Sequence, residues 1–199
     1  QLTQTDIHET LDETFSLAHT PPNLFKLLIN PFESTKTFPF IKATRWGGPA
    51  WFEGYNPKVY DYYAEDITGI LIGSPFLIFI FIAVTSRQKN INWMIASLAG
   101  SSILIFFTLL AFFYLTMRYL LDLIPALSLL ACIGFWQGIH LLRSKQTARY
   151  LYTLTGTGLW AYTIVISFII CYSNNLHRIR IYNLELIQKI TWTFSHIFR

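Results

Sequence analysis

Two ionisable residues, Arg118 and Asp122, lie four positions apart at the start of a long apolar stretch. On a helix that spacing makes them neighbours on one face, where they can form an ion pair. Ionisable groups at the edge of an apolar span are costly and usually face a polar cavity. The planar guanidinium of Arg118 suits phosphate, so the pair can act as a phosphate clamp, with Asp122 fixing the guanidinium. The alternative is that the long side chain of Arg118 carries its charged end to the membrane surface, where it forms a local ion pair that caps the helix.

A second group of polar residues precedes the first apolar stretch, in the segment Tyr60–Asp66. Its carboxylates and phenols can bind a metal, a sugar or an amine. Asp61 and Glu65 share a helix face if the helix begins early. Acidic residues in a first helical turn also favour the helix macrodipole and need no further purpose. The segment has no Asp-x-Asp pair, so a nucleotide–metal site is not indicated.

Other patterns that carry chemistry are weak or absent. No phosphate-binding glycine loop, dinucleotide fingerprint or nucleophile elbow occurs in the chain. No histidine lies four positions from another, so we expect no histidine metal site; the histidines are His8, His19, His140, His177 and His196. The carboxylates would allow a divalent metal, but no motif in the sequence supports one, and no cofactor is predicted. Aromatic residues before the first apolar stretch favour interfacial anchoring over sugar stacking; they are Trp46, Trp51, Phe52 and Tyr55.

The composition indicates an integral membrane protein. Of 199 residues, 53% are hydrophobic, 17% aromatic and only 13% charged, and the mean hydropathy is +0.40. An average soluble domain carries roughly 25% charged residues. Both cysteines fall in apolar runs, where a thiol behaves as a small hydrophobic group.

Four apolar segments are long enough to cross a hydrocarbon core, which takes about 20 helical residues. They cover about residues 67–85, 91–116, 119–142 and 150–172. The predicted fold is therefore an all-α integral membrane protein with a four-helix transmembrane bundle at 67–172. Pro75 and Pro125 are expected to kink their spans.

The segments on either side of the bundle are expected to lie at the membrane interface. In residues 1–66, the periodicity predicts an amphipathic helix at Asp6–His19, a break at Pro21-Pro22, and a short helix Leu24–Ile29 capped by Asn23. The segment from Phe32 to Pro57 that follows is rich in turn-forming and aromatic residues. Residues 173–199 read as an amphipathic tail.

The distribution of basic residues predicts the orientation. Residues 1–66 hold nine acids and five bases, whereas the remainder holds two acids and ten bases. Two loops are basic, with Arg87 and Lys89 in one and Arg143, Lys145 and Arg149 in the other, which places both in the cytoplasm. The N-terminal segment is then extracytoplasmic, although the basic tail conflicts with this orientation. Because the bases flank apolar spans, membrane lipids are expected as partners and nucleic acid is not.

Several motifs, in order along the chain, resemble one family of membrane proteins. They are Phe38-Pro39-Phe40, Tyr63-x-Glu65-x-x-Thr68-Gly69-x-Leu71, Ser74-Pro75-Phe76-Leu77 and Arg118-Tyr119-x-x-Asp122-x-x-Pro125. Over about residues 20–145 the chain resembles the C-terminal half of multipass GT-C-type glycosyltransferase-like proteins, similar to protein mannosyltransferases and aminoarabinose transferases.

The resemblance implies transfer of a sugar from a polyprenyl-phosphate donor to an extracytoplasmic acceptor, in the cell membrane or inner membrane. It assigns the donor phosphate to Arg118 of the Arg118-Tyr119 pair, with Asp122 beside it but not as the catalytic base. Glu65 and Tyr63 then orient the acceptor or hold the external loop. In the resembled family the principal catalytic acid usually lies in the first external loop, so the resemblance implies that it belongs to an upstream part of the same polypeptide. The chain begins at Gln1 without a starting methionine, which suggests a fragment of a longer polytopic protein. A non-catalytic membrane subunit or a transporter fragment is the alternative, so enzymatic activity stays open.

Overall fold

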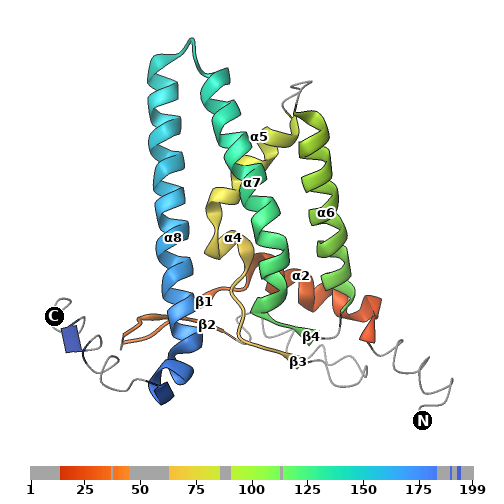
Figure 1. Cartoon of the computed structure of the whole chain (residues 1–199), viewed down its shortest axis with the longest axis vertical. Helices are drawn as coiled ribbons and strands as arrows, with labels where there is room; N and C mark the ends of the chain where they lie inside the picture. Colours follow the sequence, from red (N-terminus) through yellow and green to blue (C-terminus); the bar gives the residue numbers. More distant parts are fainter. Residues whose placement is uncertain are drawn as a thin grey trace.

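A computed structural model describes residues 14–36, 38–44, 63–85, 91–112, 114–182, 189 and 192–193, with the backbone alone for residues 18, 63, 64, 114 and 175–182. The protein is mostly helical and is built around three long apolar helices, which Figure 1 shows side by side. These are α6 (Asn92–Ala111), α7 (Met117–Leu141) and α8 (Gln146–Tyr182). Each is long and apolar enough to cross a membrane, which indicates an integral membrane protein.

The first predicted span, residues 67–85, is not one continuous helix. It consists of a single turn α4 (Ile70–Gly73), a 3₁₀ helix η2 (Pro75–Phe79) and α5 (Ile80–Thr85). Ser74 between them is non-helical, with φ −140° and ψ 64°. Pro75 explains the break, because a proline disfavours helical geometry in the residue before it and has no N–H to donate. The structure thus has three helices of spanning length in its described part, where the sequence predicted four.

The ends of the three long helices also differ from the prediction. α6 stops at Ala111, before the predicted boundary at residue 116, because Phe112 is extended and Tyr114–Leu115 form the strand β4. α7 begins two residues early and continues through Pro125. α8 has 37 residues and extends beyond both predicted ends.

A small polar and aromatic layer covers one end of the helices, and we call it the platform. It contains η1 (Leu17–His19), α2 (Thr20–Ile29), β1 (Phe32–Ser34), β2 (Ile41–Ala43), β3 (Tyr63–Ala64) and β4 (Tyr114–Leu115). β1 and β2 pair antiparallel, and β3 and β4 pair parallel. These two short sheets, at the bottom of Figure 1, were not expected from an all-α prediction.

The N-terminal helices of the platform correct two predictions. Pro21-Pro22 does not break a helix but lies in the first turn of α2. Proline is tolerated there because the first N–H groups of a helix have no intrahelical acceptor. Asn23 is consequently inside α2 and caps nothing in it. Most of the predicted helix Asp6–His19, the aromatic group at residues 46–55 and the loop at 86–90 lie outside the described residues.

Close backbone packing between α5 and α7 centres on one glycine. A Cβ atom on Gly134 would overlap the carbonyl oxygen of Phe79 and would lie 2.9 Å from the amide nitrogen of Ala83. Beside this contact the rings of Phe79 and Phe135 are 5.3 Å apart, and Phe135 stacks on Tyr152 of α8 at 5.6 Å. α5, α7 and α8 are thus joined at one level by a glycine contact and an aromatic cluster.

This packing predicts a position-specific cost of adding one methyl group. Gly134→Ala should destabilise the bundle by about 1–3 kcal/mol, because the backbones of α5 and α7 must separate. Gly158→Ala on α8 is the matched control, since a Cβ there meets nothing within 4 Å. Thermal unfolding of the purified proteins in detergent measures both. Equal melting temperatures for the two variants would contradict the close contact.

Candidate functional site

The parallel pairing of β3 with β4 joins the two segments that hold the sequence-predicted site residues. Tyr63 aligns with Tyr114 and Ala64 with Leu115. The amide of Glu65 then donates to the carbonyl of Leu115 at 3.0 Å. The segment containing Tyr63 and Glu65 therefore lies alongside the chain that leads into α7, as Figure 1 shows. Residues far apart in the sequence come to one end of the bundle.

The start of α7 is fixed by a side-chain cap. Thr116 is extended, with φ −130° and ψ 158°, and its hydroxyl accepts a hydrogen bond from the Arg118 amide at 3.0 Å. This is the ordinary role of an N-cap threonine. Arg118 thus occupies the first turn of α7 with its side chain exposed. Tyr119 is half-buried, and its ring packs edge-on against Phe112 at 5.4 Å.

The predicted ion pair between Arg118 and Asp122 is not formed. Both side chains are exposed, and the ion pair seen in the described part of the chain joins Lys42 and Glu33 at 3.3 Å. An exposed pair gains little energy and loses side-chain freedom, so helical spacing alone does not hold the two groups together. Asp122 therefore does not fix the guanidinium of Arg118 in this structure.

The macrodipole interpretation of Glu65 is also wrong. The next helix, α4, begins at Ile70 and has no acidic residue in its first turn. Glu65 is half-buried and its neighbour Asp66 is exposed, both in the extended chain after β3. Asp61 lies outside the described residues.

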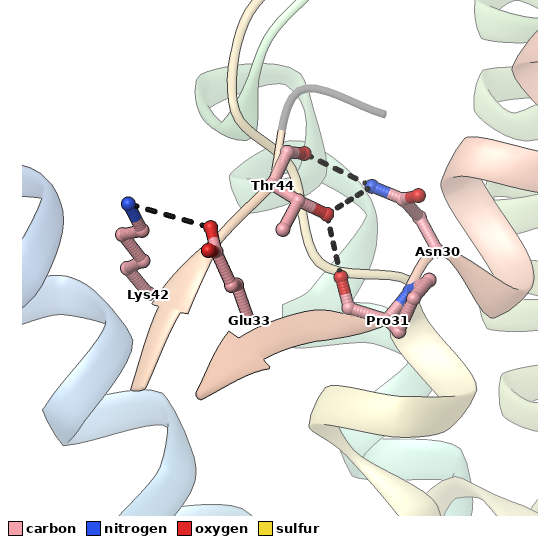
Figure 2. Close-up of polar contacts among 5 residues, drawn as sticks. All are labelled: Asn30, Pro31, Glu33, Lys42 and Thr44. Carbon is pink, nitrogen blue, oxygen red and sulfur yellow. Dashed lines mark hydrogen bonds and ion pairs between the residues drawn. The ribbon is translucent and has the colours of Figure 1, made fainter. Parts of the chain in front are cut away.

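Asn30 holds the platform to the chain that leads into the bundle, as Figure 2 shows for its bonds to Thr44. Its side-chain amide donates to the Thr44 carbonyl at 3.0 Å, to the Thr44 hydroxyl at 3.4 Å and to the Ile67 carbonyl at 2.6 Å. The Thr44 hydroxyl donates in turn to the Pro31 carbonyl at 2.8 Å. Gly69 donates its amide to the Asn30 carbonyl at 2.8 Å. A Cβ on Gly69 would lie 2.6 Å from the Asn30 nitrogen, so glycine is needed for this approach.

Asn23 performs a similar function between the platform and α6. It is fully buried, and its amide donates to the carbonyls of Leu109 and Leu110 at 3.1 Å and of Phe112 at 2.7 Å. The last carbonyls of a helix have no intrahelical donor. Asn23 therefore terminates α6 from outside and directs the chain into β4 and the cap of α7.

Two buried polar residues were not predicted as site residues from the sequence, although Thr68 belongs to one of the quoted motifs. Gln137 of α7 and Thr68 before α4 are each 4% exposed. In the part of the chain that the structure describes, their side-chain polar atoms have no hydrogen-bond partner. A single glutamine within a long apolar run was the available signal for Gln137. Each unpartnered polar group costs free energy in this setting.

Metal-binding geometry is not evident in the described residues, where no three His, Cys, Asp or Glu side chains are grouped to hold an ion. His19 is buried in the platform and His140 is exposed at the far end of α7. The chain matches no protein-family model, no curated protein and no solved structure.

The bonds of Asn23 predict how α6 responds when its external donor is lost. Asn23→Asp keeps the shape of the side chain but removes both N–H groups and places an acceptor against three carbonyls. The free energy of unfolding should therefore fall by about 1–3 kcal/mol. Amide hydrogen exchange should accelerate in residues 108–116. Ser101→Ala is the control, because that hydroxyl bonds only within α6, to Leu98. Unchanged exchange in Asn23→Asp would show that the amide does not hold the end of α6.

Proposed function

We propose that this chain is the membrane-embedded part of a glycosyltransferase that uses a polyprenyl-phosphate sugar donor, and that the platform end of the bundle receives the donor. The supporting observation is the β3–β4 pairing, which puts Glu65 beside the start of α7. A site at this edge suits a substrate whose chain lies in the membrane and whose sugar lies outside it.

Arg118 is the proposed contact for the donor phosphate. A cation in the first turn of a helix opposes the macrodipole, at a cost of about 0.3–1 kcal/mol. The stability of α7 therefore does not explain its presence there. A phosphate beside this turn would be attracted by both the guanidinium and the helix N-terminus.

The acidic groups near Arg118 suit the polar parts of the substrates. Glu65 is half-buried, while Asp66 and Asp122 are exposed. Carboxylates accept hydrogen bonds from sugar hydroxyls, so Glu65 is the proposed group that orients the acceptor or steadies the loop. Tyr63 pairs with Tyr114 in the same β3–β4 contact and belongs to the same edge. We assign no catalytic base here, because the resemblance places it in an upstream segment.

The proposed orientation puts the platform outside the cytoplasm. Arg143, Lys145 and Arg149 are exposed at the opposite end of the bundle, and basic loops are retained in the cytoplasm. The broken segment Ile67–Thr85 then crosses as a fourth, discontinuous span. α8 returns to the platform, where Tyr172 packs against Phe38 at 5.3 Å.

A transporter fragment is the second candidate, and one observation favours it. The break at Ser74 between α4 and η2 resembles the discontinuous helices that form substrate sites in transporters. The two candidates differ in what they do to a lipid-linked sugar: an enzyme cleaves the sugar from its carrier, whereas a transporter moves the molecule unchanged. Product analysis after incubation of the complete polypeptide in vesicles separates them.

Substitution of Arg118 tests the phosphate contact. Arg118→Ala and Arg118→Lys should each raise the dissociation constant for a polyprenyl phosphate at least about tenfold, because an ammonium group cannot replace the planar fork. Lys42→Ala is the control, since Lys42 is an exposed cation at the same end. Native mass spectrometry of the purified protein with added polyprenyl phosphate measures the constants. Wild-type affinity in Arg118→Ala would refute the assignment.

Cysteine labelling tests the orientation. After Cys132 and Cys171 are replaced by serine, Glu33→Cys should react with a membrane-impermeant maleimide in intact cells. Lys145→Cys should react only after the membrane is permeabilised, because the two positions lie at opposite ends of the bundle. The reverse pattern would invert the proposed topology.

A further inference from the structure

The connection between α7 and α8 carries a compact group of basic residues, Arg143, Lys145 and Arg149, which we call the hairpin cations. All three are exposed. The acidic residues that the structure describes are at the platform end or in the first turns of α7; they are Glu33, Glu65, Asp66 and Asp122. Within the described residues, therefore, no carboxylate is available to neutralise the hairpin cations.

Backbone hydrogen bonds fix the hairpin that carries these charges. The amide of Arg143 donates to His140 at 3.2 Å, that of Lys145 to Leu142 at 3.0 Å and that of Arg149 to Lys145 at 2.9 Å. The turn is therefore only a few residues long and keeps the three cations close in the chain. The first turn of α8 also contains no acidic residue, so the helix dipole adds to the positive potential.

The surroundings of the hairpin cations are those of a lipid rather than of a free anion. Trp136 and Tyr150 are 65% and 68% exposed, one or two turns from the hairpin on α7 and α8. Such aromatic residues settle at the level of the lipid headgroups. Leu141 and Leu151, 69% and 57% exposed, provide apolar surface next to the charges. A molecule that matches both features has a phosphate head and hydrocarbon tails.

We propose that the α7–α8 hairpin binds the headgroup of an anionic phospholipid in the leaflet at that end of the bundle. The lipid phosphate is held by the hairpin cations, and its acyl chains lie along the exposed leucines. This surface is separate from the proposed donor contact at Arg118, because the two lie at opposite ends of α7. It binds structural lipid of the leaflet, not the sugar carrier.

Lipid binding to the whole chain tests the proposal by native mass spectrometry in detergent, with phosphatidylglycerol and phosphatidylcholine as probes. The wild-type chain should bind phosphatidylglycerol at least about tenfold more tightly. Each hairpin cation should contribute about fivefold, since basic groups near an anionic surface act roughly independently. Arg143→Gln/Arg149→Gln should therefore remove most of the preference, while Lys36→Gln/Lys42→Gln, an equal loss of exposed charge at the platform, should retain it.

Three results would overturn the proposal. The first is an unchanged lipid preference in the Arg143→Gln/Arg149→Gln protein. The second is an equal loss of preference in the platform control, which would indicate a non-specific charge effect. The third is displacement of phosphatidylglycerol by millimolar inorganic phosphate, which would identify a free-anion site. Far-UV circular dichroism of both double variants verifies that the helices remain folded.

Discussion

The arrangement of this protein depends on two buried asparagine amides that bond to backbone carbonyls from other segments. Asn23 satisfies three carbonyls at the end of α6, and Asn30 bonds to Thr44 and Ile67. A carbonyl left without a donor away from water costs free energy, and the last carbonyls of a helix have no intrahelical donor. The amides therefore connect α2 to the end of α6 and to the chain that leads into α4. With that end fixed, Tyr114–Leu115 can pair with β3, and the proposed site edge forms.

The sequence predicted what depends on local composition. Long apolar runs are sufficient to identify α6, α7 and α8, because few structures other than a helix satisfy their backbone in lipid. Their ends were less accurate. A non-local contact from Asn23 lies at the end of α6, and a local side-chain cap by Thr116, which the sequence interpretation did not use, lies at the start of α7. The β3–β4 pairing joins only two residues from each strand, too few to leave a periodic pattern. The residue types of the proposed site could thus be identified, but not their proximity.

The broken segment at Ser74 and the continuous helix through Pro125 show that a proline alone does not predict a break. Pro75 follows a single helical turn, α4, whose own hydrogen bonds are few, so the helix ends and a new one begins. Pro125 lies in a helix of 25 residues, where one lost hydrogen bond is a small fraction of the total. The contact between Gly134 and the backbone of α5 then fixes the second piece of the broken segment against α7.

Charge is distributed unequally between the two ends of the bundle, and this inequality connects orientation with both proposed lipid contacts. The described acids lie at the platform end, where α7 begins with Arg118, whereas the charged side chains of the hairpin are exposed bases. On the proposed lipid binding, an exposed basic hairpin favours the orientation in which it meets an anionic leaflet. The two proposals therefore rely on different features: the planar guanidinium of Arg118 and the N-terminus of α7 at the platform end, and the sum of three positive charges at the hairpin.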